Sequence, residues 1–257
     1  MLKRLSIALI CLLILGPAVS APAFDAGPQP DLAGWWPFDE MTGTVAHDAS
    51  GNGNDGVFVG DPQWVPGIIG GALEFNGNDY LNCGRGDSLN IRDQITIAFW
   101  FKVQAFTNTW EAFLAKSDAA YRASRGGGTG NGTHMGITGG NYFNAPTIIT
   151  DGQWHHYCAT YNGSAAIIHI DGVEDARQTY SGQIGDSSAY DLYIGENSGA
   201  TGRFLHGLLD DVRLYSRALP IEQILIVMAG YSGNIATNPS PADEAIDVPR
   251  DVVLSWD

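Results

Sequence analysis

Two closely spaced Asx-Gly dipeptides, Asn162-Gly163 and Asp171-Gly172, constrain the fold of this chain more than any other feature of its sequence. Such pairs accept the positive φ angles that a two-residue β-hairpin turn requires. The stretches that flank them, 154–161, 166–170 and 173–176, carry aromatic and β-branched residues, which favour strands. We therefore expect three antiparallel strands in this region and an all-β protein.

Further strands are expected from similar patterns, and one segment is expected to be helical. The run 95–103 is the most apolar of the predicted strands, so it is expected to lie in the middle of a sheet. Residues 220–229 are expected to form a short helix, because proline suits a first turn, the interior is apolar and Gly230 follows. The other predicted strands are 32–38, 57–59, 70–75, 80–83, 112–116, 134–137, 189–194 and 207–215.

The central hairpins also carry a resemblance. The segments Asp151-Gly-Gln-Trp-His-His, Ala159-Thr-Tyr-Asn-Gly and Ile170-Asp-Gly resemble the signature of laminin-G-like, concanavalin-A-like jelly-roll domains of secreted bacterial proteins. Other landmarks of that family follow in the right order: Gly34-Trp-Trp-Pro-Phe-Asp-Glu, Asp48-Ala-Ser-Gly-Asn-Gly-Asn-Asp-Gly, Ala72-Leu-Glu-Phe-Asn-Gly, Ile95-Thr-Ile-Ala-Phe-Trp-Phe and Leu209-Asp-Asp-Val-Arg-Leu-Tyr-Ser-Arg-Ala-Leu. The resemblance implies a two-sheet antiparallel jelly-roll sandwich with one short C-terminal helix. It does not fix a function, since this fold hosts lectins, adhesion modules, glycosidases and spacers.

The ends of the chain are expected to lie outside this domain. Residues 1–23 have a basic start, an apolar run and small residues at the cleavage positions, as a secretory signal peptide does. The jelly-roll domain is then expected to occupy 24–230. Residues 231–245 have the composition of a linker, and 246–257 look like the first strand of an immunoglobulin- or fibronectin-type module. Because one strand cannot bury a core, we expect the chain to continue into further domains of a larger extracellular protein.

The net charge of the chain limits the classes of partner that it is expected to bind. It has 13 Lys and Arg against 28 Asp and Glu, a net charge of −15, and removal of a leader that contains Lys3 and Arg4 makes the balance more acidic still. Such a surface repels nucleic acid and anionic lipid, so neither nucleic-acid binding nor membrane insertion is expected. It suits a secreted protein and attracts divalent cations.

Two cysteines, Cys83 and Cys158, remain after removal of the leader. In an oxidising compartment such a pair can form a disulfide. Alternatively, each is a small buried apolar residue, since free cysteine is among the most buried residue types. We take the disulfide forward as a prediction, with the second alternative open.

A structural calcium ion is the predicted cofactor. Asp48 and Asn54 lie in a Gly-rich loop whose side-chain and backbone oxygens are the ligands that Ca²⁺ prefers. In related jelly-roll domains an Asp of the last strand can bind an ion against a loop carbonyl, and Asp210 matches that position. The resemblance therefore implies Asp210, Asp48 and Asn54 as ligands. The alternative is that Asp48 and Asn54 cap turns and that Asp210 is solvated.

Catalysis is not expected. Glycosidases of this fold use two carboxylates at positions i and i+4 of one strand, which share a face. The chain has no Glu-x-Asp-x-Glu motif, and the adjacent acids of Asp210-Asp211 and Glu174-Asp175 point to opposite faces of a regular strand. For the same reason His155-His156 is expected to contribute one core and one surface side chain.

Sugar binding requires exposed aromatic rings with polar neighbours. The segment Asn141-Tyr142-Phe143 and Trp110 are the predicted ligand-binding residues, although any one ring is as well explained by the core of a sandwich. The sequence thus predicts a secreted, non-catalytic module that binds glycans or surface proteins. A structural spacer is the first alternative, and a glycoside hydrolase of the same fold is the second.

Overall fold

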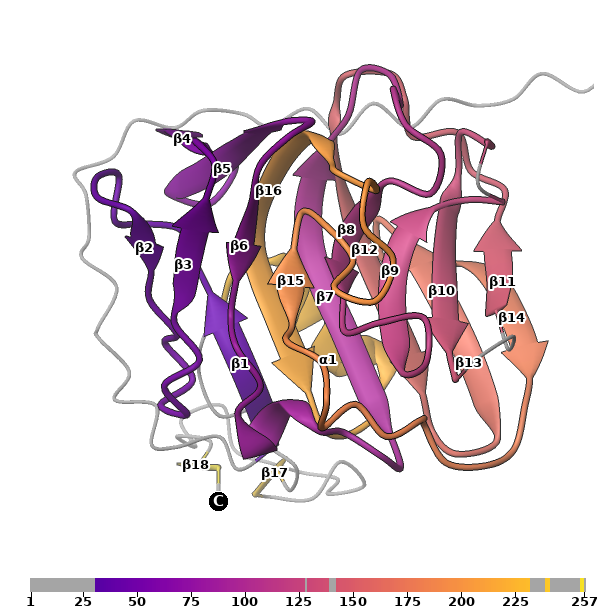
Figure 1. The fold of residues 1–257 in the computed structure, drawn as a ribbon. Coiled ribbons are helices and arrows are strands. Elements are labelled where there is room, and N and C mark those ends of the chain that lie inside the picture. The colour runs from indigo at the N-terminus through magenta and orange to yellow at the C-terminus, as the bar shows by residue number, and fades with distance from the viewer. Residues whose placement is uncertain (1–30, 128, 139–141, 232–238, 241–254, 257) are drawn as a thin grey trace, which may run out of the picture.

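The computed structural model describes residues 31–127, 129–138, 142–231, 239–240 and 255–256. Its main body consists of two antiparallel eight-stranded sheets that pack face to face, with one short helix, α1 (Ile221–Met228), near the end of the domain (Figure 1). The predicted all-β, two-sheet jelly-roll sandwich with one short C-terminal helix is therefore confirmed.

The first sheet, sheet A, has the strand order β14-β13-β12-β7-β16-β5-β4, and β1 also pairs with β16. The long strand β7 lies in its middle, as its apolar sequence predicted. The strands of sheet A are β1 (Leu32–Trp36), β4 (Gln63–Pro66), β5 (Gly71–Asn76), β7 (Ile95–Lys102), β12 (Trp154–Tyr161), β13 (Ala165–Ile170), β14 (Val173–Thr179) and β16 (His206–Tyr215).

The second sheet, sheet B, has the order β11-β10-β9-β8-β15-β6-β3-β2. Its strands are β2 (Val45–Ala46), β3 (Gly56–Val59), β6 (Tyr80–Asn82), β8 (Ala112–Ala115), β9 (Tyr121–Arg125), β10 (Thr133–Ile137), β11 (Tyr142–Ala145) and β15 (Tyr193–Ile194). A 3₁₀ turn, η1 (Asp87–Leu89), precedes β7, and β17 (Pro239–Ser240) pairs with β18 (Ser255–Trp256).

The two predicted hairpin turns are present, and each is stabilised locally. Gly163, Asp171 and Gly172 have positive φ angles, while the Asn162 side-chain oxygen accepts the backbone N–H groups of Ser164 and Ala165. The strand after the second turn, β14, continues three residues beyond the predicted end at 176. Local turn chemistry therefore fixes the order β12-β13-β14 at one edge of sheet A.

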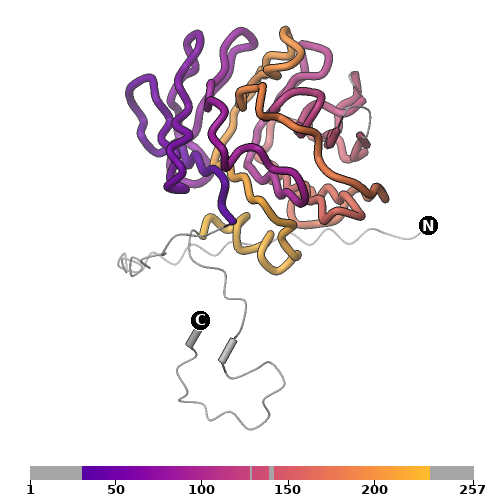
Figure 2. Tube along the Cα trace, turned by 60° about the horizontal axis from the view of Figure 1, so that its bottom comes forward, coloured from indigo at the N-terminus to yellow at the C-terminus, as the bar shows by residue number. Residues whose placement is uncertain are grey.

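The core lies between the sheets and is rich in aromatic rings. Alternate residues of β7 point into it, and Phe99 stacks on Tyr157 of the neighbouring strand with ring centroids 4.8 Å apart. A second, smaller core covers the opposite, outer face of sheet A, where α1 packs against the strands through Ile224 and Val227. Figure 2 shows α1, in yellow, against one side of the sandwich. The helix therefore covers part of the outer face of sheet A.

The predicted disulfide is wrong, because both cysteines are free and buried. Cys83 follows β6 of sheet B and belongs to the core between the sheets, whereas Cys158 points out of sheet A into the smaller core beneath α1. The backbone of sheet A thus separates the two thiols. The alternative prediction, two small buried side chains, describes them correctly.

The predictions for the chain ends lie outside the described residues. This applies to the signal peptide at 1–23 and to the linker and module start at 231–257, apart from Tyr231 and the short strands β17 and β18. These assignments stay predictions.

Candidate functional site

The outer face of sheet B brings two of the four predicted ligand residues together. Trp110, directly before β8, and Tyr142, in β11, have ring centroids 6.2 Å apart at an interplanar angle of 82°. The ring of His134, from β10, lies 5.2 Å from Trp110 and 5.3 Å from Tyr142. We call Trp110, His134 and Tyr142 the aromatic platform. The ring of Tyr142 is solvent-accessible, with a relative exposure of 49%.

Strand alternation explains which side chains reach this face. In β10, Met135 and Ile137 point into the core, so His134 and Gly136 point outward. In β11, Phe143 joins the core with 8% exposure, which leaves Tyr142 outside. The predicted ligand residue Phe143 therefore does not lie at this surface. Asn141, the fourth predicted residue, lies outside the described residues.

An arginine that sequence reasoning had not singled out lies beside the platform. Arg122 of β9 is paired with Gly136 of β10, and a Cβ atom at position 136 would collide with the Arg122 guanidinium. The glycine thus lets the guanidinium lie flat across β10, next to Tyr142. The alternation of polar and apolar residues in 121–125 is the sequence signal that could have identified Arg122 as an outward residue.

Asp118 links two arginines at this site. Arg203 donates two hydrogen bonds to its carboxylate, at 2.8 and 3.0 Å, and lies over the Trp110 ring with Cζ 5.9 Å from the centroid. Arg122 Nε is 3.4 Å from Asp118 Oδ1 but is not aligned for a hydrogen bond. Burial raises the pKa of Asp118. The hydrogen bond from Arg203 and the charges of both arginines lower this pKa by a larger amount, so the net shift is downward. A second buried carboxylate, Glu196, accepts the backbone N–H of Arg203 at 2.9 Å, so acidic groups lie close to both arginines.

His134 is buried and electrically neutral at physiological pH. Burial, together with the charge of Arg122, lowers its pKa to about 4. Its Nδ1 atom is 3.1 Å from the side-chain oxygen of Asn144, while its Nε2 atom has no hydrogen-bond partner. An unsatisfied buried nitrogen beneath two aromatic rings calls for a hydrogen-bonding ligand or a bound water.

The residues predicted to bind calcium lie in two separate places, with Asp48 and Asn54 in one loop and Asp210 in strand β16. Asp48 Oδ1 accepts the N–H groups of Trp35 and Ser50, and its Oδ2 accepts that of Asn54, each at 2.9 Å. Asn54 in turn donates to the carbonyl of Ala33 in β1 at 3.0 Å. Asp48 and Asn54 are thus brought together, and their hydrogen bonds tie the loop to β1 and, through the Ser88 hydroxyl, to η1.

Asp210 lies in a different setting. Its Oδ2 accepts the N–H groups of Ile68 and Ile69 at 2.8 and 2.9 Å, but its buried Oδ1 has no partner. Burial raises the pKa of this carboxyl to about 7. Gly67 packs closely against Asp210 Oδ2 and the Gly71 carbonyl, and Gly71 packs closely against the Phe38 carbonyl, so that neither position has room for a Cβ atom. An orphaned, desolvated carboxylate oxygen in such a cradle suits a cation.

No three His, Cys, Asp or Glu side chains within the described ranges gather as metal ligands. An ion at Asp210 would therefore take most of its ligands from backbone carbonyls.

Three further residues singled out in the sequence have structural partners. Asp211, next to Asp210, forms a buried ion pair with Arg213 at 2.9 Å. It has a φ of 48° at a β-bulge of β16, so the regular alternation expected for Asp210 and Asp211 is interrupted there. His155 lies between Asp151 and Asp171, whereas His156 is buried on the opposite face against Trp100. The two histidines thus diverge, as alternation predicted.

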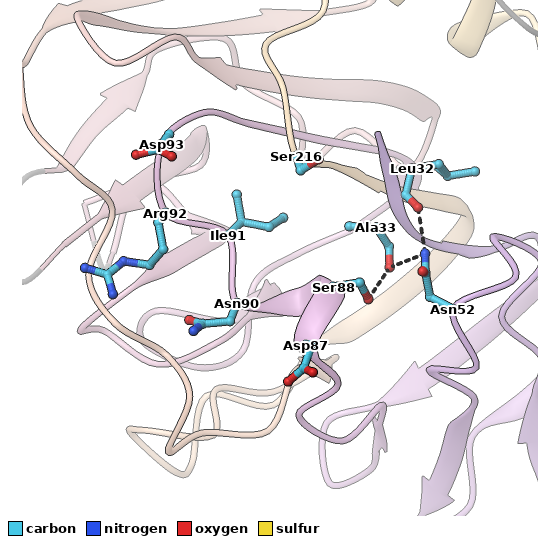
Figure 3. A pocket seen from close by; sticks show the side chains of 10 residues that line it. All are labelled: Leu32, Ala33, Asn52, Asp87, Ser88, Asn90, Ile91, Arg92, Asp93 and Ser216. Carbon is cyan, nitrogen blue, oxygen red and sulfur yellow. Dashed lines mark hydrogen bonds between the residues drawn. The ribbon is translucent and has the colours of Figure 1, made fainter. Parts of the chain in front are cut away.

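A cavity of about 400 Å³ lies elsewhere, between β1, η1 and the loop before β7. Asn52 and Ser88 point at the β1 carbonyls of Leu32 and Ala33 there (Figure 3). No aromatic ring lines this cavity, so it offers no stacking surface for a sugar.

Comparison with known proteins agrees with this architecture. A model of the Concanavalin A-like lectin/glucanases superfamily matches residues 75–225, more than half of the chain. The chain therefore belongs to this superfamily. No curated protein sequence matches the chain.

Solved structures share the fold at low sequence identity. Domain 4 of AbnA, a GH43 extracellular arabinanase from Geobacillus stearothermophilus, solved in complex with arabinotriose, has a TM-score of 0.62 and 24% identity over 77% of this chain and 98% of that domain. The binding domain of Paraclostridial Mosquitocidal Protein 1 has a TM-score of 0.61 and 15% identity over 81% of this chain and 54% of its own. The binding domain of botulinum neurotoxin DC, in complex with rat synaptotagmin II, has a TM-score of 0.59 and 11% identity over 82% of this chain.

The chain spans about half the length of these toxin domains, 54% and 55%. All three structures are of binding domains or of an accessory domain of an enzyme, while the superfamily as a whole also includes glucanases. In the part of this chain that the structure describes, no helix has the length and apolar character needed to cross a membrane.

Proposed function

We propose that this domain is a secreted, non-catalytic module that binds glycans through the outer face of sheet B. The observation that carries the proposal is the pairing, on one sheet face, of accessible aromatic rings with a buried nitrogen that lacks a partner: Trp110 and Tyr142 over His134. Sugar sites combine apolar rings for the ring faces with a few fixed polar groups for the hydroxyls. The fold shared with an arabinanase domain solved with arabinotriose supports this choice of ligand class.

The absence of catalysis is inferred from the acids at the site. Hydrolysis of a glycosidic bond normally requires two carboxyl groups that flank the bond. Asp118 is the carboxylate that contacts the platform region in the described ranges, and it is held by Arg203 and Arg122. A carboxylate that balances two guanidinium groups is a poor proton donor, because its pKa is lowered.

The test is a binding titration of arabino-oligosaccharides, followed by calorimetry, with wild type and the variants Trp110→Ala and Tyr142→Ala. Each variant is expected to weaken binding about tenfold, which corresponds to about 1.4 kcal/mol. The control is Tyr231→Ala, because Tyr231 is 68% exposed and far along the chain, after α1. If wild type binds no neutral oligosaccharide in a broad glycan screen, the spacer alternative replaces this proposal.

We further propose that calcium stabilises the domain at Asp210. The orphaned Oδ1 atom in its glycine cradle supports this position, whereas the carboxylate of Asp48 already accepts three backbone N–H groups. When bound, the ion would offset the cost of burying the Asp210 charge and tie β16 to the 67–71 turn.

Secretion and continuity with further domains complete the proposal. They rest on the leader at residues 1–23 and on the linker and strand pattern at 231–257. Detection of the domain in the culture medium, with its N-terminus near residue 24, tests the first. Sequencing of the full-length gene tests the second.

A further inference from the structure

The protonation of His134 follows from the orientation of the Asn144 side chain. The backbone N–H of Gly127 lies 2.7 Å from the Asn144 atom assigned as Oδ1. A backbone N–H only donates, so that atom must be the carbonyl oxygen and not the amide nitrogen. The same oxygen lies 3.1 Å from His134 Nδ1. Nδ1 must therefore donate, and it carries a proton.

The second ring nitrogen is then an acceptor. A neutral imidazole has one proton, so with Nδ1–H occupied the Nε2 atom presents a lone pair. His134 is kept neutral because burial opposes a charge and Arg122 lies on the same sheet face. Nε2 is a buried lone pair without a partner, and only a group that carries a hydrogen can satisfy it.

We propose that His134 Nε2 accepts a hydrogen bond from a sugar hydroxyl, and that this makes the platform select neutral sugars over sugar acids. The inference rests on the proposed glycan-binding function and names its ligand class. A hydroxyl can donate to Nε2 and at the same time accept from a nearby guanidinium. A carboxylate has no proton to donate at neutral pH, so its lone pairs would face that of Nε2. A uronic acid must therefore keep its carboxylate away from Nε2 and place one of its hydroxyls there, which leaves it fewer ways to bind than a neutral sugar.

The charges of the chain act in the same direction. Arg122 and Arg203 would attract a carboxylate, but both already lie against Asp118, so an acidic sugar would compete with an internal partner. At longer range the net charge of −15 repels anions. A site with a buried polar group discriminates strongly against a ligand that leaves this group unpaired.

Access to Nε2 requires a movement of the platform. The atom has no exposed surface, and the rings of Trp110 and Tyr142 lie against the His134 ring, so we expect one of these rings to turn aside when a sugar enters. Trp110 is the better candidate, because its backbone has a φ of 60°, which is unfavourable for a bulky residue. Sugar binding is therefore expected to change the tryptophan fluorescence of the chain, and Trp110→Phe is expected to remove most of that change.

The direct experiment compares arabinotriose with trigalacturonate by calorimetry. Wild type is expected to bind arabinotriose at least about tenfold more tightly, and His134→Phe, which keeps an aromatic ring without the nitrogen, is expected to lose about tenfold of that affinity. The matched control is His169→Phe, because His169 is also a buried histidine with an unpaired Nδ1 but lies in sheet A. This control is expected to leave the affinity within about twofold.

A second measurement avoids the risk that His134→Phe misfolds. Long-range ¹H–¹⁵N correlation of ¹⁵N-histidine in wild type reports the tautomer of His134 directly, and saturating arabinotriose is expected to shift the Nε2 resonance. Three results would each overturn the inference: a protonated Nε2, an Nε2 resonance that does not shift when the sugar is added, or equal affinity for arabinotriose and trigalacturonate. If binding depends on Trp110 and Tyr142 but not on His134, glycan binding stands and this inference fails; if wild type binds neither sugar, both fail.

Discussion

Both sheets present a buried histidine on the face that points away from the common core, and the two histidines differ in what covers them. His134 of sheet B lies under two separate rings, Trp110 and Tyr142. His156 of sheet A packs against Trp100, whose indole N–H donates to the Met228 carbonyl at the end of α1. One histidine is thus covered by two rings, and the other by a ring that is hydrogen-bonded to the end of a helix.

The comparison shows that a perturbed pKa does not by itself identify a binding site. Burial lowers the pKa of His156 to about 3 and that of His134 to about 4, and each residue has one ring nitrogen without a partner. To uncover His156, the Trp100 ring must break its hydrogen bond to the Met228 carbonyl at the end of α1. To uncover His134, one ring must rotate. The cost of opening, and not the electrostatics, separates a structural face from a binding face.

The largest expected effect comes from loosening the helix. Ile224→Ala leaves a cavity between α1 and sheet A and is expected to lower the free energy of unfolding by about 2–4 kcal/mol, with sugar affinity unchanged at temperatures where the variant is folded. Urea unfolding and calorimetry measure the two quantities. Leu225→Ala is the control, because the Leu225 side chain is 44% exposed and is expected to cost less than about 1 kcal/mol. A loss of sugar binding in folded Ile224→Ala would show that the two faces are coupled.

Acid is expected to weaken the fold through the buried histidines. Their folded pKa values lie below the unfolded value, so the unfolded chain takes up protons first, and stability is lost as the pH falls below about 6.5. At pH 5 the loss from His156 alone is about 2 kcal/mol. His156→Phe cannot titrate, so its loss of stability between pH 7 and pH 5 in urea unfolding is expected to be smaller than that of wild type by this amount. Identical losses in both proteins would contradict the burial of a neutral imidazole.

Local chemistry made much of the fold predictable. The turns at 162–163 and 171–172, the apolar strand β7 and the helix α1 each depend on residues close in sequence, and all are present. Whether the disulfide could form depended on which side of its sheet each cysteine side chain points to. That orientation is fixed by strand pairing between segments far apart in the sequence. The sequence alone does not contain the register that sends Cys83 and Cys158 to opposite sides of sheet A.

The platform was half predictable for the same reason. Trp110 and Tyr142 have the residue type of a sugar-binding ring, but their proximity arises from the successive pairing of β8, β9, β10 and β11 in sheet B. Alternation alone indicates that only one of Tyr142 and Phe143 can face solvent, and the structure selects Tyr142. His134 carries no distinguishing signal in the sequence, because its role depends on Asn144, its partner across the β10–β11 pair.

Removal of calcium is expected to affect the buried acid of sheet A and not the acid beside sheet B. Asp210 of sheet A has an unsatisfied oxygen, whereas Asp118 beside sheet B is satisfied by arginine. With free calcium at about ten times its Kd, binding adds about 1.4 kcal/mol of stability, so a chelator is expected to lower the Tm by about 3–5 °C. Asp210→Asn is expected to abolish this response in differential scanning fluorimetry, and Asp118→Asn to retain it while losing sugar affinity. A wild-type Tm that does not change with chelator excludes the ion.

The smallest expected effect concerns the glycine beneath the arginine. Gly136→Ala places a methyl group where the Arg122 guanidinium lies, so the guanidinium must move away from the platform. We expect sugar affinity to fall about threefold, a change of under about 1 kcal/mol. A double-mutant cycle separates this from a general distortion of β10: in an Arg122→Met background, Gly136→Ala is expected to have almost no further effect on affinity. Additive losses would mean that the methyl group acts on the strand itself and not through the Arg122 guanidinium.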